Sequence, residues 1–140
     1  MKVRVLYIIL FLFIFSCSVF ADAFVPEFDK MKTLRCDYEE TIYNQDNSVV
    51  TKNKLFRVFK IDDEYKKFYL GKEQLKDITY FDNDRIEFDF QSMTDDFIML
   101  SHTSINRNTG EYSSSAELTY DNPIFGVRNS KSIGTCKIVN

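Results

Sequence analysis

Hydrophobic and polar residues alternate most regularly in residues 97–121, and this alternation predicts two β-strands joined by a tight turn. The bulky apolar members of the alternation are Phe97, Met99, Ile105, Tyr112, Leu118 and Tyr120. Polar and charged residues occupy most of the positions between them. One face of the hairpin is therefore apolar, and burial of that face sets the register between the two strands.

The turn of this hairpin is predicted to contain four residues: Arg107, Asn108, Thr109 and Gly110. Gly110 supplies the positive φ that such a loop requires at its last position. This loop length places Ile105 opposite Tyr112, so that the apolar faces of the two strands coincide. The alternative is a three-residue loop with a bulge at Gly110, which shifts the pairing by one residue and turns His102 inward.

Similar but shorter patterns occur on both sides of the hairpin. Strands are expected at about residues 33–43, 54–61, 65–70, 77–81, 85–91 and 132–139. Residues 124–131 are expected to be a loop, residues 72–76 a helical turn or a loop, and residues 26–32 one helical turn. We therefore predict an all-β fold, an antiparallel meander of about eight strands closed as a small barrel or sandwich.

The apolar run near the start of the chain does not belong to this sheet. Lys2 and Arg4 precede an almost unbroken apolar segment at residues 5–15. Small residues suitable for cleavage follow, at Ala21 and Ala23. The segment is shorter than a transmembrane helix requires. The pattern is typical of a signal peptide, and an uncleaved anchor is the alternative.

We therefore expect residues 1–21 to be a signal peptide and residues 22–140 to form a single β domain, exported to the periplasm or outside the cell. A lipoprotein attached through Cys17 is a further alternative. Cleavage leaves two cysteines, Cys36 and Cys136, near the two ends of the domain. In an oxidising compartment they predict a disulfide that joins the first strand to the last, and two free buried thiols are the alternative.

The charge of the chain argues against two classes of partner. The sequence has 18 basic and 21 acidic side chains, so removal of Lys2 and Arg4 with the signal peptide leaves a net charge of about −5. Nucleic acids and anionic membranes favour a basic surface, and neither is an expected partner.

No pattern in the sequence marks a catalytic or metal site. His102 is the only histidine, and the expected register places it on the outer face. A Ser-His-Asp arrangement with Ser104 or Ser113 would lack a nucleophile elbow and a glycine-rich oxyanion loop. Three acidic clusters lack the spacing of a calcium loop and lie where strands must turn: Asp62-Asp63, Asp82/Asp84 and Asp95-Asp96. We expect no enzymatic activity, no cofactor and no metal.

The centre of the apolar face of the hairpin consists of small side chains. They are Ser101, Thr103, Ser114 and Ala116, and bulky residues lie at both ends of the face. This arrangement leaves room above the sheet. Aromatic rings from an opposite wall would fill the room in a densely packed core, whereas a small barrel could hold a small apolar ligand there. These four residues are the candidate ligand-facing positions.

Four short motifs follow one another along the chain: residues 59–62 (FKID), residues 86–88 (IEF), Ile105-x-Arg107-x-Thr109-Gly110 and Gly134-x-Cys136. Their order resembles that in a group of small exported bacterial β-proteins of unknown function. The resemblance implies a fold and a compartment, and it assigns no catalytic residues. A second likeness is to periplasmic lysozyme inhibitors of the small-barrel type, which also carry an early and a late cysteine. Their Ser-Gly-x-x-Tyr loop is absent here.

Three classes of function remain. The expected one is a non-catalytic interaction protein that binds a partner protein through its loops or an exposed sheet face. The second is a carrier of a small apolar ligand. The third is an enzyme, which the single histidine and the four glycines make the least expected class.

Overall fold

The computed structural model describes residues 28–139, which form one antiparallel β-sheet preceded by a short 3-10 helix. The elements are η1 (Phe28–Lys30), β1 (Lys32–Tyr43), β2 (Val49–Asp62), β3 (Lys67–Leu70), β4 (Glu73–Gln74), β5 (Ile78–Phe81), β6 (Arg85–Met93), β7 (Phe97–Asn106), β8 (Glu111–Tyr120) and β9 (Val127–Val139). The helix η1 falls within the expected helical turn. The expected signal peptide and Cys17 lie outside the described residues.

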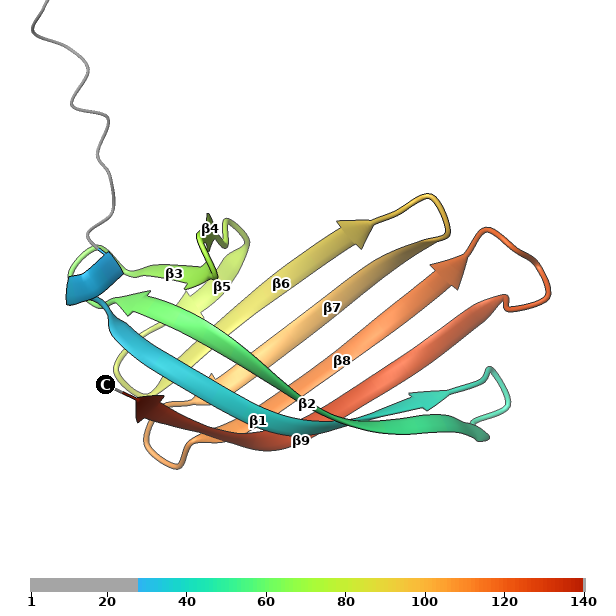
Figure 1. The fold of residues 1–140 in the computed structure, drawn as a ribbon, viewed down its shortest axis with the longest axis horizontal. Helices are drawn as coiled ribbons and strands as arrows, with labels where there is room; N and C mark the ends of the chain where they lie inside the picture. The colour runs from blue at the N-terminus through green and yellow to red at the C-terminus, as the bar shows by residue number, and fades with distance from the viewer. Residues whose placement is uncertain (1–27, 140) are drawn as a thin grey trace, which may run out of the picture.

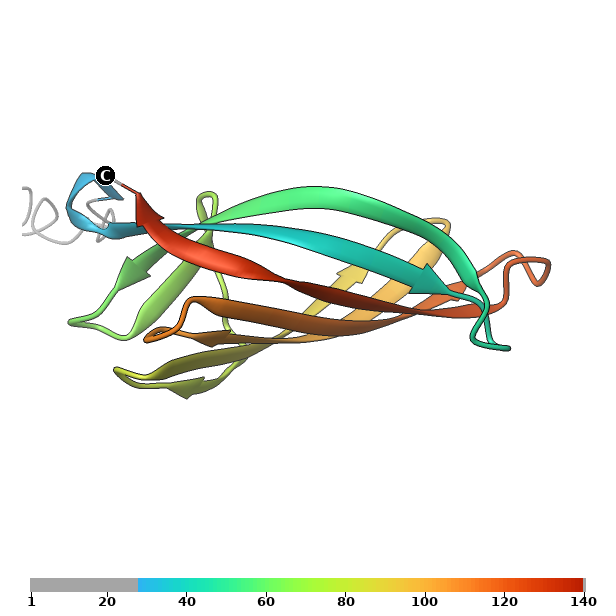
Figure 2. The same cartoon turned by 90° about the horizontal axis from the view of Figure 1, so that it is seen from below.

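The nine strands follow one another across the sheet in the order β4-β3-β2-β1-β9-β8-β7-β6-β5 (Figure 1). The first long strand, β1, thus lies between β2 and the last strand, β9. β4 and β5 are consecutive in the chain but form the two opposite edges. The sheet curls across its strands into a half-barrel, in which β1, β2 and β9 face β6, β7 and β8 (Figure 2). The expected antiparallel meander is confirmed, with nine strands in place of about eight.

The pairing of β7 with β8 confirms the predicted hairpin. Ile105 lies opposite Tyr112, as the four-residue turn requires, and Phe97 lies opposite Tyr120. Gly110 has a φ of 78°, and its amide donates to the main-chain oxygen of Asn106 at 2.9 Å. The alternative register, with a bulge at Gly110, is therefore wrong.

Several strands are longer than the sequence pattern predicted. β9 begins at Val127, so the expected loop at residues 124–131 is wrong for its second half, which pairs with β8. β2 begins at Val49, which pairs with Tyr43 at the far end of β1. Residues Glu73–Gln74 form the short strand β4, where a helical turn or a loop was expected. These segments are polar or irregular in pattern, and a neighbouring strand overrides their weak intrinsic preference.

The hydrophobic core lies inside the curl, where side chains from strands near the two opposite edges of the sheet contact one another. Phe59 of β2, Phe68 of β3 and Phe88 of β6 are at most 1% exposed. The ring centroids of Phe59 and Phe68 are 4.7 Å apart, and those of Phe68 and Phe88 are 5.3 Å apart. β3 and β6 are not neighbours in the sheet, so this contact holds the curl. Burial of each ring contributes about 1.5–3 kcal/mol.

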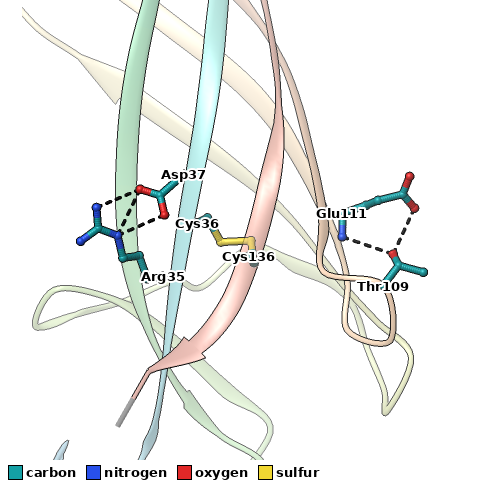
Figure 3. The surroundings of a disulfide bond; sticks show 6 residues. All are labelled: Arg35, Cys36, Asp37, Thr109, Glu111 and Cys136. Atoms are coloured by element: carbon teal, nitrogen blue, oxygen red, sulfur yellow. Dashed lines mark hydrogen bonds and ion pairs between the residues drawn. A yellow bond between two sulfur atoms is a disulfide. The ribbon is translucent and has the colours of Figure 1, made fainter.

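The predicted disulfide between Cys36 and Cys136 is confirmed, and it joins directly opposed residues of β1 and β9 (Figure 3). Both cysteines are buried on the inner face. Their Cα atoms are 3.9 Å apart, the close spacing of a non-hydrogen-bonded pair in an antiparallel ladder. The amide of Cys136 accordingly points away from β1, and it donates to the main-chain oxygen of Gly110 at 2.6 Å.

Candidate functional site

An open groove of about 600 Å³ crosses β6, β7, β8 and β9 at one level of the sheet. Two rows of exposed side chains border it. One row contains Asp89, His102, Ser115 and Lys131, and the other contains Gln91, Leu100, Glu117 and Asn129. Between the rows run Phe90, Ser101, Ala116 and Ser130, which alternate to the inner face. The strand register therefore fixes two parallel lines of exposed side chains on the outer face, all of them polar except Leu100.

The first row has the residue types of a catalytic triad. Oδ1 of Asp89 lies 2.7 Å from Nδ1 of His102, and Ser115 is the next residue across the sheet. At Ser115, however, β8 is paired with β7 on one side and with β9 on the other. Its neighbouring amides are committed to the ladder, so they cannot form an oxyanion hole. Ser115 therefore has the Asp89–His102 pair beside it but no free main-chain amides of its own strand to bind an oxyanion.

The serines that the sequence suggested as partners of His102 lie elsewhere on the same face. Ser104 and Ser113 are opposite each other, and each lies two residues along its strand from the pair of His102 and Ser115. The hydroxyl of Ser104 donates to Glu87 at 3.4 Å. The predicted register placed Ser115 beside His102, and the structure confirms this, but Ser115 was not considered as the partner of the histidine.

The four candidate ligand-facing residues come together as the register predicted. Ser101 lies opposite Ala116, and Thr103 lies opposite Ser114. Oγ1 of Thr103 is 2.9 Å from Oγ of Ser114, and Thr103 is fully buried. The hydroxyl of Ser101 donates to the main-chain oxygen of Phe90 at 3.2 Å. Ser101 and Ala116 also line the groove, whereas Thr103 and Ser114 do not.

β9 extends this small-residue region. Ser130 pairs with Ala116, and Ser132 pairs with Ser114, so hydroxyl groups continue onto a third strand. Both serines are buried. Sequence reasoning missed Ser130 because residues 124–131 were expected to be a loop, and it missed Ser132 because the neighbour of β9 was unknown.

Two stacked tyrosines border this region. Tyr38 of β1 and Tyr112 of β8 flank Gly134 of β9 from opposite sides. Their ring centroids are only 4.9 Å apart, because Gly134 places no side chain between them. The guanidinium of Arg57 lies over the ring of Tyr38 at 5.8 Å. Burial raises the pKa of Tyr112 above its ordinary value. The predicted Gly134-x-Cys136 motif thus combines a close aromatic contact with the disulfide.

A second cavity, of about 300 Å³, lies beside the disulfide at the end of the half-barrel. Its apolar wall consists of Leu34, Ile61, Ile105, Cys136 and Ile138. All of these except Ile138 are buried. The polar rim comes from residues 106–110, in the turn between β7 and β8, and from Lys137. An apolar interior with a polar rim is the usual composition of a small-molecule pocket.

Arg107 joins three turns at the same end of the molecule. Its Nη2 donates to Oδ1 of Asp63 at 2.6 Å, and its Nη1 donates to the main-chain oxygen of Asp82 at 2.7 Å. Asn108 donates to Asp84 at 2.9 Å. The β7–β8 turn is thereby tied to the β2–β3 and β5–β6 turns. The sequence predicted Arg107 and Asn108 only as turn residues, and the long-range partners were missed.

The carboxylate of Asp63 is stabilised in its charged form by this arrangement. Burial alone would raise the pKa of Asp63, but hydrogen bonds from Lys32 and Arg107 and the charges of these two residues hold the pKa below its ordinary value. Lys32 donates to Oδ2 of Asp63 at 2.7 Å, and Arg107 to Oδ1. Two of the acidic turns considered for calcium thus supply acceptors for Lys32, Arg107 and Asn108.

Comparison of the chain with protein families, with curated proteins and with solved structures finds no match. Within residues 28–139, no helix has the length and apolar character needed to cross a bilayer. The same residues contain no cluster of three or more histidine, cysteine or acidic side chains suited to a metal ion.

Proposed function

We propose that this protein is an exported, non-catalytic interaction protein that binds a partner protein through the outer groove across β6–β9. The observation that carries the proposal is the pair of exposed side-chain rows that border the groove. Each row contains one residue from each of four paired strands, so the ladder fixes the distances between these side chains in the free protein. Binding therefore loses little conformational entropy. The rows carry two carboxylates, a lysine, a histidine, a serine and two amides around the exposed Leu100, as suits a protein contact with hydrogen bonds and an apolar centre.

Export is part of the same proposal. A disulfide between Cys36 and Cys136 is typical of an oxidising compartment such as the periplasm or the cell exterior. It agrees with the signal peptide expected at residues 1–21 and with the resemblance to small exported bacterial β-proteins. Closure of the sheet as a small barrel or sandwich is also part of the proposal. Mass spectrometry of the mature N-terminus tests the proposed cleavage.

Site-specific cross-linking tests the binding surface. A photo-reactive residue at position 115, in the groove, should capture the partner in cells. The same residue at position 119, on the outer face of the same strand but outside the groove, should not. His102→Ala and Glu117→Lys should each reduce capture at position 115, whereas Thr119→Ala should leave it unchanged. Equal capture at both positions would contradict the assignment of the groove.

An inhibitor of lysozyme is one specific form of this interaction protein, suggested by the second sequence likeness. The check is a turbidity assay, in which the protein should slow the clearing of a bacterial cell-wall suspension by lysozyme. The loss of inhibition in Glu117→Lys would place that activity in the groove.

A carrier of a small apolar ligand is the second candidate, and the cavity beside the disulfide favours it. Ile138 lies at this cavity, and Ile133 lies on the outer face of the same strand; both side chains are exposed. Ile138→Trp should displace a ligand from the cavity, whereas Ile133→Trp is the matched control. Native mass spectrometry of the purified protein would show a co-purified ligand that is lost only in Ile138→Trp. The absence of any bound mass in the wild type would exclude a stably held ligand.

A further inference from the structure

One long edge of the half-barrel has no neighbouring strand. β2 pairs with β1 from Val49 to Ile61, but it pairs with β3 only from Phe59 to Asp62. Among the described residues, positions 49–58 therefore have a strand on one side only. This free stretch is longer than a typical complete strand of about 5–6 residues. Natural proteins usually keep such edges short or cover them, because unpaired main-chain groups recruit further strands.

The ladder shows which main-chain groups point out of this edge. Cys36 and Cys136 form a non-hydrogen-bonded pair, so the amide and carbonyl of Cys36 point toward β2, where its partner is Arg57. Alternate residues of a strand direct these groups to opposite sides. The residues whose amides and carbonyls point away from β1 are Lys52, Lys54, Phe56 and Val58. The observed bond from the Cys136 amide to Gly110 agrees with this assignment.

The side chains along the same edge are unusually apolar for an exposed strand. The large hydrophobic residues and their exposed fractions are Val49 (54%), Val50 (40%), Leu55 (42%), Phe56 (60%) and Val58 (37%). Strand alternation places Phe56 and Val58 together on the outer face, whereas Leu55 lies on the inner face, where it pairs with Tyr38. An exposed apolar pair beside an open edge suits contact with the side chains of an added strand.

The basic residues of this edge indicate the charge of the partner that it binds. Residues 49–58 contain Lys52, Lys54 and Arg57 and no carboxylate, although the whole chain has a net charge of −3. Lys52 pairs with Glu39 of β1 at 3.8 Å, which offsets part of this charge. A second copy of β2 would still place its own three cations beside these, and opposed like charges destabilise a strand pair. Edge lysines are also a common means of preventing self-association. An acidic segment would pair favourably.

We propose that the free edge of β2 accepts an extended, acidic segment of a partner protein as an additional strand. The segment exchanges main-chain hydrogen bonds with Lys52, Lys54, Phe56 and Val58, and its carboxylates contact the two lysines. Its apolar residues pack on Phe56 and Val58. This surface lies on a different strand from the groove across β6–β9, so a negative result for one binding surface does not affect the other.

The test uses a fluorescein-labelled nine-residue peptide, Thr-Val-Thr-Val-Thr-Glu-Thr-Glu-Thr, with binding followed by fluorescence anisotropy. In an antiparallel strand, its valines and glutamates share one face, with the valines against Val58 and Phe56 and the glutamates against Lys54 and Lys52. Phe56→Pro removes one amide that points out of the edge and leaves the ladder with β1 intact, since proline is tolerated at strand edges. Phe56→Ala removes the same ring and keeps the amide. We expect Phe56→Pro to bind at least about tenfold more weakly than Phe56→Ala, which corresponds to about 1.4 kcal/mol.

Two further measurements examine the role of the lysines and the location of the bound peptide. Lys52→Glu combined with Lys54→Glu should weaken binding of the acidic peptide by about tenfold or more, whereas His102→Ala in the groove should not change it. Hydrogen exchange should show peptide-induced protection of the amides at Lys52, Lys54, Phe56 and Val58.

Three results would overturn the proposal. The first is equal binding by Phe56→Pro and Phe56→Ala. The second is protection at β6 in place of β2. The third is a dimer of the unliganded protein that Phe56→Pro dissociates, because the edge would then serve a second copy of the chain. Static light scattering of the wild type and of Phe56→Pro distinguishes this last case.

Discussion

Arg107→Ala removes the side chain that holds three turns of the half-barrel together. The Arg107 side chain is 16% exposed, and its guanidinium donates one hydrogen bond to the Asp63 carboxylate and one to the main-chain oxygen of Asp82. A hydrogen bond that involves a charged group contributes about 1.5–3 kcal/mol. The Asp63 side chain is 35% exposed, so solvent reduces its share. We expect the free energy of unfolding to fall by about 3 kcal/mol and Tm to fall by about 10–15 °C.

Urea denaturation followed by circular dichroism measures the loss. Arg85→Ala is the matched control, because Arg85 is 48% exposed and pairs with Glu87 on the surface, where an ion pair contributes less than about 1 kcal/mol. A double-mutant cycle with Asp63→Ala isolates the interaction between Arg107 and Asp63. We expect a coupling free energy of about 1 kcal/mol.

Hydrogen exchange locates the effect. If Arg107 joins the three turns, Arg107→Ala should increase exchange in the β2–β3 and β5–β6 turns as well as in its own turn. Two results would refute this reasoning. One is a change in unfolding free energy no larger than that of Arg85→Ala, and the other is faster exchange confined to residues 106–111. Either would mean that Arg107 acts only within its own turn.

The remaining predictions concern the inner face and the acid stability. Gly134→Ala should lower the free energy of unfolding by about 2–3 kcal/mol, because the added β-carbon would meet the backbone of β1 at Asp37; a thermal unfolding midpoint equal to that of the wild type would contradict this. Cys36→Ser combined with Cys136→Ser should lower the free energy of unfolding by about 4 kcal/mol, because the disulfide closes a loop with a sequence separation of 100. Equal urea midpoints for the wild type and the double variant would contradict this, because the unfolded chain would then be equally restricted without the disulfide. Asp63 has a lowered pKa in the folded state, so its stabilisation is present above the unfolded pKa of about 3.9 and is lost as the pH falls through the folded value. The wild type should therefore exceed Asp63→Asn in stability at neutral pH, and thermal melts should show the difference shrinking as the pH falls below about 4; a constant difference would exclude the linkage.

Local sequence was sufficient for the hairpin of β7 and β8. Its register follows from a turn that needs a positive φ at Gly110 and from two apolar faces that coincide in only one alignment. Both constraints act within about 25 residues, and burial of one face penalises any slip by one position. The positions of Ser101, Thr103, Ser114 and Ala116 relative to one another followed at once. The disulfide was also predictable, because only two cysteines remain after residue 21.

Other features depended on which strands became neighbours. The sequence predicted a disulfide between the first and last strands, but it did not reveal that β1 lies between β2 and β9, which makes β4 and β5 the edges. The length of β9, the outer groove, the free edge of β2 and the partners of Arg107 all follow from that order. These contacts join residues far apart in the chain, such as Arg107 and Asp63. Their residue types are ordinary for turns and strands, so no local pattern marks them.

The period of the strands and the hairpin register follow from side-chain alternation and from the conformational freedom of one glycine, and the disulfide follows from the number of cysteines. The groove, the serine-lined third strand and the unpaired edge depend on which strands lie side by side. Hydrogen bonds between strands are made by the main chain, which is the same for every residue except proline. Which edges pair, and which stay open, is settled by packing of the whole half-barrel.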